Sequence, residues 1–212
     1  MTLNKQSGNM YGFVTHTWNV IKGKCPHNCE YCYMKVHPQK DFYFDSKEFK
    51  TDLGRNNFIF VGSSIDMWAN EIPFTWITSI LNHCKKYPEN TYLFQTKNPS
   101  RFIKFRDELV SLNCVLGTTI ETNRQELLNK FSGGEGIHAR SDAMIIHGFR
   151  KMITIEPIMD FDVTQLVSEI SRTYPEWVNV GADSKGHNLP EPSRFKIDNL
   201  IAELSKFTRV IQ

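Results

Sequence analysis

In the stretch KCPHNCEYCY (residues 24–33), three cysteines lie within eight positions: Cys25, Cys29 and Cys32. The other two cysteines, Cys84 and Cys114, stand alone in apolar segments, and we expect both to be small core residues because free cysteine is among the most buried residue types. An odd number of cysteines does not suit a disulfide framework. The clustered thiols therefore indicate metal ligation or redox chemistry.

The cysteine cluster has three interpretations. A structural zinc site needs four converging ligands, so His16, His27 or His37 would have to complete it. A ferredoxin-type cluster needs four cysteines, and no fourth cysteine lies nearby. In the third interpretation, the three thiolates bind three irons of a [4Fe–4S] cluster and leave the fourth iron open.

The spacing Cys-x3-Cys-x2-Cys, with Tyr31 directly before the last cysteine, resembles the signature of the radical S-adenosylmethionine (SAM) superfamily. The resemblance implies that the open iron chelates the amino and carboxylate groups of SAM. One electron then breaks the S–C5′ bond and releases a 5′-deoxyadenosyl radical, which a fourth thiolate would prevent. It also implies a one-electron donor such as flavodoxin or ferredoxin, whose identity the sequence does not reveal.

Outward from the cysteines, short β-rich runs alternate with helical patterns, which is typical of parallel strands joined by crossover helices. We predict strands at Val14–Val20, Phe58–Val61, Tyr92–Gln95, Val115–Thr119, Met152–Ile155 and Val178–Val180. We predict helices at Phe74–Lys86, Arg101–Leu112, Val163–Tyr174 and Arg194–Phe207, and a helix, loop and second helix within Gln125–Phe149.

Six such units in 212 residues predict an α/β fold, an open partial (β/α)6 barrel with mostly parallel strands, since a full eight-unit barrel takes about 250 residues. The radical SAM resemblance implies the same core, with the cysteine loop after the first strand. We expect one domain over residues 1–212, with the cluster loop at 22–34 and an aromatic insert at 35–57. The insert either packs against the barrel side, which we favour, or forms a lid.

Polar residues follow every predicted strand, and in parallel β/α sheets ligand groups collect at these carboxyl ends. The resemblance implies that Gly62, Ser63 and Ser64 meet the SAM amino group, although they depart from the commoner Gly-Gly-Glu form. It also implies that Thr118 and Glu121 contact the ribose and that Tyr31 lies near the adenine. Thr96 and Lys97 could face the SAM carboxylate, whereas the alternative for Lys97 is a salt bridge with Glu121 or Glu156.

The remaining strand-end residues predict a substrate with hydrogen-bond donors or a positive charge. Our candidates for substrate binding are Asn19, Asp66, Trp68, Asn98, Glu156 and Asp183. Trp68 would stack on a flat heterocycle or, alternatively, fill the space between strand and helix. We expect His138, His147 and His187 to be ordinary surface or core histidines.

Nearly end to end, the chain is similar to a group of small phage-type radical SAM proteins. The matching residues include Thr17-Trp18-Asn19, Val61-Gly62-Ser63, Thr96-Lys97-Asn98-Pro99, Gly117-Thr118 and Glu156-Pro157. This resemblance implies queuine lyase as a candidate activity, which cleaves the C–N bond of queuine to release 7-aminomethyl-7-deazaguanine for salvage into tRNA. The alternatives are a phage-type enzyme that modifies a nucleotide or DNA base, and a non-enzymatic zinc-binding module.

Composition limits the class of partner. The chain has 25 basic and 23 acidic residues, a balance too even to indicate bulk binding of nucleic acid or anionic lipid. No stretch approaches the roughly 18 apolar residues of a membrane span, and the start of the chain lacks the apolar core of a signal peptide. We therefore expect a cytoplasmic protein with a small deazapurine or nucleoside-like substrate, no membrane partner and no nucleic-acid partner.

Overall fold

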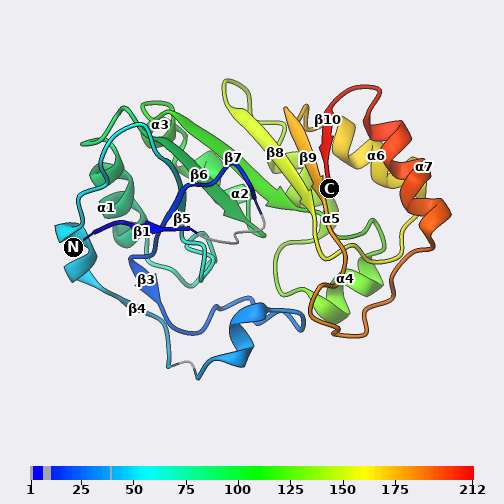
Figure 1. Cartoon of the computed structure of the whole chain (residues 1–212), viewed down its shortest axis with the longest axis horizontal. Helices are drawn as coiled ribbons and strands as arrows, with labels where there is room; N and C mark the ends of the chain where they lie inside the picture. Colours follow the sequence, from blue (N-terminus) through cyan, green and yellow to red (C-terminus); the bar gives the residue numbers. More distant parts are fainter. Residues whose placement is uncertain (1, 7–10, 39) are drawn as a thin grey trace.

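The computed structural model describes residues 2–6, 11–38 and 40–212, and its centre is an open sheet (Figure 1). In sheet order the strands are β1 (Asn4–Lys5), β2 (His16–Trp18), β5 (Phe58–Val61), β6 (Thr91–Thr96), β7 (Cys114–Thr119), β8 (Arg150–Ile155), β9 (Trp177–Val180) and β10 (Arg209–Ile211). Every neighbouring pair from β2 to β10 is parallel, whereas β1 pairs antiparallel with β2. The predicted α/β partial barrel is confirmed, with β1 and β10 added at its edges.

Helices connect the parallel strands. They are α1 (Phe74–Cys84), α2 (Ser100–Lys104), α3 (Arg106–Leu109), α4 (Gln125–Phe131), α5 (Ile137–Ala143), α6 (Val163–Ser171) and α7 (Arg194–Leu204). The single helix predicted over Arg101–Leu112 is wrong, because the backbone leaves the helical region at Phe105, where φ is −114°. Within the described ranges, no helix has the length and apolar character needed to cross a membrane.

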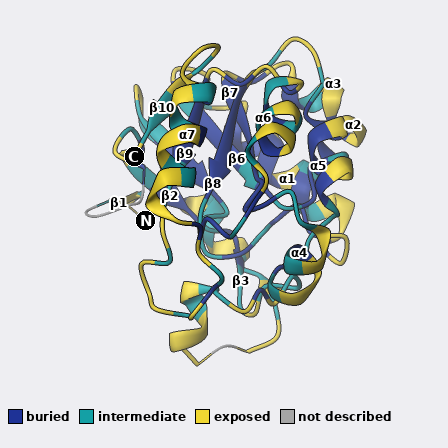
Figure 2. Ribbon diagram, turned by 90° about the vertical axis from the view of Figure 1, so that its right-hand side faces the viewer, coloured by how far each residue is buried: buried dark blue, intermediate teal, exposed yellow. Residues whose placement is uncertain are grey.

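The two faces of the sheet carry different cores, because side chains alternate along a strand. Ile59 and Val61 of β5 join the main core beneath the helices, whereas Phe60 faces a second, smaller core. Tyr11 and Val14, which precede β2, pack in that second core. Figure 2 shows the buried strands behind helices whose outer surfaces are exposed. The N-terminal segment therefore closes one end of the barrel interior and leaves the carboxyl ends of the strands open.

The aromatic insert packs against the side of the barrel. It contains β4 (Tyr43–Phe44), which pairs with β3 (Ile21–Lys22) at the start of the cluster loop, and the 3-10 turn η2 (Ser46–Lys50). The 3-10 turn η1 (Tyr33–Val36) leads from the cluster loop into the insert. Phe44 lies 5.1 Å from Trp76, and Phe49 lies 5.8 Å from Trp18, measured between ring centroids. The core-packing interpretation of these aromatic residues is therefore correct.

Candidate functional site

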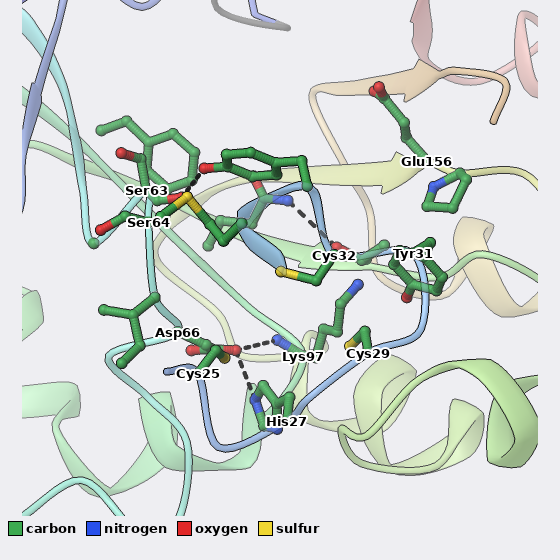
Figure 3. Close-up of a pocket in the computed structure, with 18 of the residues that line it drawn as sticks. Cys25, His27, Cys29, Tyr31, Cys32, Ser63, Ser64, Asp66, Lys97 and Glu156 are labelled. Atoms are coloured by element: carbon green, nitrogen blue, oxygen red, sulfur yellow. Dashed lines mark hydrogen bonds and ion pairs between the residues drawn. The ribbon is translucent and has the colours of Figure 1, made fainter. Parts of the chain in front are cut away.

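A cavity of about 780 Å³ opens at the carboxyl ends of the parallel strands (Figure 3). It is large enough for a drug-sized ligand. The structure brings together here most of the residues predicted from the sequence: Asn19, Cys25, Cys29, Tyr31, Cys32, Gly62, Ser63, Ser64, Asp66, Thr96, Lys97, Glu156 and Asp183. Trp68, Asn98, Thr118 and Glu121 do not line it. The polar residues that follow the predicted strands therefore indicated the position of the cavity and most of the residues that line it.

The three clustered cysteines are free thiols that line this one cavity. Tight turns space them along the loop, with Cys32 N donating to Cys29 O over 3.1 Å. Burial raises the pKa of the Cys25 thiol to about 12, so this thiol stays protonated at neutral pH unless a metal stabilises the thiolate. Cys84 and Cys114 are buried core residues, as predicted.

The two candidate metal centres place different demands on the three thiols. Among residues 2–6, 11–38 and 40–212, no three cysteine, histidine, aspartate or glutamate side chains form a group that could hold a metal ion. A zinc site of three cysteines and a histidine needs such convergence. An iron–sulfur cluster makes a different demand, because each thiolate binds its own iron at a separate corner. Cys25, Cys29 and Cys32 line one cavity.

Asp66 anchors the cysteine loop to the barrel. Its Oδ2 lies 2.8 Å from His27 Nε2 and also accepts hydrogen bonds from Thr96 Oγ1 and Lys97 N, both over 2.8 Å (Figure 3). Burial acts to raise the pKa of Asp66, but the hydrogen bond and charge of His27 lower it below its ordinary value. We predicted Asp66 as a substrate ligand, whereas its carboxylate is already engaged by these donors. His27, which we considered only as a zinc ligand, is the residue that it holds.

Glu121 is buried beneath the cavity and is surrounded by donors. Its carboxylate accepts from the Tyr31 hydroxyl, from Lys97 Nζ over 2.7 Å and from Arg140 Nη1 over 2.8 Å. Burial would raise its pKa, but the charges of Lys97 and Arg140 hold that pKa far below the usual range. Glu121, which we predicted as a ribose ligand, is fully buried and does not line the cavity. It instead fixes Tyr31 and Lys97 in the cavity wall.

Two threonines predicted as SAM ligands form hydrogen bonds within the protein. Thr118 is fully buried, and its hydroxyl donates to Thr96 O over 2.7 Å, which ties β7 to β6 away from the cavity. Thr96 does reach the cavity, but its hydroxyl is bonded to Asp66. For Lys97 the salt-bridge alternative with Glu121 holds. The Lys97 ammonium also lies 5.1 Å from the Tyr31 ring centroid, so both side chains keep one fixed arrangement.

The turn after β5 is tied to the end of β2 and to the cysteine loop. Gly62 has φ of +78°, a conformation that favours glycine. Asn19 joins this loop to the end of β2, since its Nδ2 donates to Ser63 Oγ over 3.1 Å and its Oδ1 accepts from Ser64 N over 3.2 Å. The Tyr33 hydroxyl donates to Ser63 O over 2.7 Å and thereby links the cysteine loop to the same turn.

Trp68, which we predicted to stack on a substrate, does not line the cavity. Its side chain is fully buried and packs against Phe94, Phe102 and Phe105, with ring centroids 5.6, 4.8 and 5.6 Å away. The alternative of a plug between strand and helix is correct. Asn98 is also buried and donates to Trp68 O over 2.9 Å, so it supports the turn after β5 rather than a substrate.

Glu156 has a different environment from the other acidic residues of the cavity. Figure 3 draws it apart from the cysteines, with no dashed line to another residue. Its side chain packs against the backbone of Gly181, where a Cβ would lie 2.5 Å from Glu156 Cδ. Burial raises the pKa of Glu156. Asp183, by contrast, accepts from His187 Nδ1 over 2.7 Å, and this pair forms another part of the wall.

Ser132, Gly133 and Arg140, which contact residues of the site, are among the residues that the sequence analysis missed as functional candidates. They lie in or after the loop between α4 and α5, far from the cysteines in sequence. The only sequence signal was the interruption Ser132-Gly133-Gly134, which predicted a break between helices and no contact with the cysteine loop.

Comparison with known structures supports the fold. The chain is similar to a doubly substituted spore photoproduct lyase with bound AdoMet (SAM) and dinucleoside spore photoproduct. The identity is 11% and the TM-score 0.65, and the match covers 97% of this chain and 66% of that one. The chain is also similar to spore photoproduct lyase in complex with dinucleoside spore photoproduct, at 12% identity and a TM-score of 0.64. This match covers 97% of this chain and 64% of that one. This chain thus spans about two thirds of the length of those proteins.

Comparison of sequences assigns the family. A search of curated proteins finds no match. Residues 10–191 match a family whose description reads "Protein of unknown function (DUF5131)". The matched range contains the cysteine loop, Asp66, Glu121 and Glu156, and it covers most of the chain. The protein belongs to the DUF5131 family.

Proposed function

We propose that this protein is a radical SAM enzyme that holds a [4Fe–4S] cluster through Cys25, Cys29 and Cys32. The observation that carries this proposal is the position of three free thiols from one loop in a cavity at the carboxyl ends of a partial barrel. The fold is similar to that of a lyase solved with bound AdoMet. When bound, the cluster supplies the electron that cleaves SAM into methionine and a 5′-deoxyadenosyl radical.

The chain's own residues prepare the cavity for such a ligand. The turn Gly62–Ser64 presents backbone groups and hydroxyls beside Cys32 and Tyr33, and these can accept hydrogen bonds from an ammonium group. Tyr31 and Lys97 form a wall whose position is set by Glu121. Because these groups are held by buried partners, they need little rearrangement when a ligand binds.

Anaerobic reconstitution tests the proposed cofactor. Wild-type protein should take up four irons and four sulfides per chain, become brown, and release 5′-deoxyadenosine from SAM when a reductant is added. Cys29→Ala should lose the colour and the SAM cleavage. The matched control is Cys84→Ala, which removes a buried thiol far from the loop and should keep both. A wild-type protein that binds one zinc and no iron would contradict the proposal.

For the reaction, we infer a carbon–nitrogen lyase acting on queuine. The support is Glu156, a half-buried carboxylate without a hydrogen bond or ion pair among the described contacts, which suits an ammonium group or a paired N–H edge. Queuine offers a secondary ammonium, a guanine-like edge and a diol. The radical would abstract a hydrogen atom from the cyclopentenyl portion to give 5′-deoxyadenosine, and the resulting substrate radical would break its C–N bond. One further electron from the same reductant and one proton from solvent would convert the remaining radical fragment into a closed-shell product.

Incubation with queuine, SAM and reductant separates the proposed substrate from the proposed cofactor. The expected products are 5′-deoxyadenosine and 7-aminomethyl-7-deazaguanine. Formation of 5′-deoxyadenosine without base cleavage would reject queuine and leave the radical SAM proposal standing. A flavodoxin or ferredoxin, the expected class of donor, can replace the chemical reductant in the same assay.

A second candidate is an enzyme that modifies a nucleotide or a DNA base. It is favoured by the dinucleoside ligand of the similar lyase, which lies in a protein of the same fold. The formal charge of +2 does not provide a broad basic surface. Tight binding to oligonucleotides with a steep salt dependence would support this candidate over the small-molecule lyase.

A further inference from the structure

The connection between α4 and α5 lies directly against the cysteine loop. Glu30 N donates to Phe131 O over 2.9 Å, and His27 Nδ1 lies 3.2 Å from Gly133 O. On its other side, the connection touches the end of β6, where Glu135 N donates to Lys97 O over 2.9 Å. Residues 131–135, which we call the loop clamp, therefore join the cysteine loop to the barrel.

Gly133 permits this contact because it has no side chain. A Cβ at this position would lie 1.7 Å from the carbonyl oxygen of His27 and 2.6 Å from its carbonyl carbon. Both atoms belong to the backbone of the cysteine loop, so the loop itself would have to move. Gly136, five residues after Phe131, is different: a Cβ there would meet only the end of the Gln125 side chain, at 3.2 Å.

Ser132 brings a hydroxyl to the second cysteine. Its side chain is buried, and its Oγ lies 3.9 Å from Cys29 Sγ and 3.2 Å from Glu121 Oε1. It accepts a hydrogen bond from Arg140 Nη2 over 3.0 Å, which leaves its single proton for either Cys29 or Glu121. Glu121 already receives hydrogen bonds from Tyr31, Lys97 and Arg140. It does not depend on the Ser132 proton.

We propose that the loop clamp positions the cysteine loop and that Ser132 donates a hydrogen bond to the Cys29 thiolate. This inference rests on the proposed function, because the hydrogen bond reaches a cluster only if Cys29 is one of its ligands. A hydrogen bond to a ligand sulfur stabilises the more negative, reduced form of a cluster and so raises its reduction potential. Ser132 is a positioning residue that acts on the metal centre through Cys29.

The reduction potential of the reconstituted protein tests the role of Ser132. Ser132→Ala should bind the same amount of iron as wild type and show a lower potential in a titration followed by electron paramagnetic resonance. Ser132→Thr retains the hydroxyl and should restore the potential toward the wild-type value. Equal potentials in wild type and Ser132→Ala, at equal iron content, would overturn the hydrogen bond.

The loop clamp is tested in the metal-free protein, where activity plays no part. Gly133→Ala should speed tryptic cleavage after Lys24 and Lys35, the two lysines that flank the cysteines, whereas Gly136→Ala should match wild type. Equal cleavage rates in all three proteins would overturn the clamp. If Gly133→Ala does not fold, hydrogen exchange of the wild-type protein decides: the Glu30 amide, which donates to Phe131 O, should exchange slowly, and fast exchange would overturn the clamp. A wild-type protein that binds no cluster rejects the proposed function and the Ser132 role together, whereas the proteolysis result still reports on the clamp.

Discussion

Replacement of Arg140 with methionine should destabilise the protein strongly, because it removes one of the two cations that pair with the buried Glu121 carboxylate. Arg140 and Glu121 are both fully buried, and Arg140 Nη1 also donates to Thr119 O over 2.8 Å. Its Nε donates to Glu135 O over 2.7 Å. Removal of one partner of a buried ion pair costs about 3–5 kcal/mol. In a chain of this size, each kcal/mol shifts the melting temperature by about 2–4 °C.

The expected fall in melting temperature is therefore roughly 6–20 °C for the metal-free Arg140→Met protein. Thermal and urea unfolding followed by circular dichroism measure it. The matched control is Arg194→Met, which removes an arginine paired with Asp198 on the exposed surface of α7 and should change stability little. If the two variants unfold at the same temperature, the reasoning that the Glu121 site depends on Arg140 is refuted.

Three further predictions concern other residues. Trp68→Ala should cost about 3–5 kcal/mol of unfolding free energy because it leaves a cavity in the packed core. Trp68→Phe should cost much less. A Trp68→Phe variant with unchanged stability but a raised KM would instead favour the stacking role. Burial lowers the pKa of His83, so the unfolded chain takes up its proton first as pH falls. The full contribution of neutral His83 to stability is thus present above about pH 6.5 and is lost below it. Urea unfolding from pH 5 to 8 should therefore show an unfolding free energy that depends less on pH in His83→Phe than in wild type. Glu156→Gln should remove a charged hydrogen bond worth about 1.5–3 kcal/mol, so that KM for a cationic substrate rises roughly ten- to hundredfold. Because burial raises the pKa of Glu156, wild-type affinity should fall as pH drops through that raised value, and a wild-type profile identical to that of Glu156→Gln would exclude the role.

The parallel strands could be predicted from the sequence because each is a compact run of apolar and β-branched residues followed by polar ones. Phe58–Val61 matches β5 at both ends. The edge strands could not be predicted in this way. β1 consists of two polar residues, and β10 is only three residues long. Each is a strand because it pairs with a neighbouring strand of the sheet. The break at Phe105 is likewise a feature of tertiary packing, since the residues on both sides favour a helix.

The cavity was predictable because the carboxyl ends of parallel strands meet, but the partner of each side chain was not. The sequence offers Asp66, Glu121, Glu156 and Asp183 as equivalent acids. Only the three-dimensional structure shows that Asp66 pairs with His27. It also shows that Glu121 pairs with Lys97 and Arg140. Burial separates residues that hold the framework from residues that face the cavity, and burial depends on contacts between distant segments.

The packing of the N-terminal segment determines which molecules the cavity can admit. Phe60 lines the cavity and also lies 6.1 Å from the Tyr11 ring, and Phe13 stacks on Tyr11 and meets Trp177 at 5.2 Å. These rings make a solid floor, so the barrel is a blind-ended well with its entrance at the cysteine side. A polymer cannot thread through such a well. A large substrate would have to insert a protruding end or an everted unit, whereas a free base could enter whole.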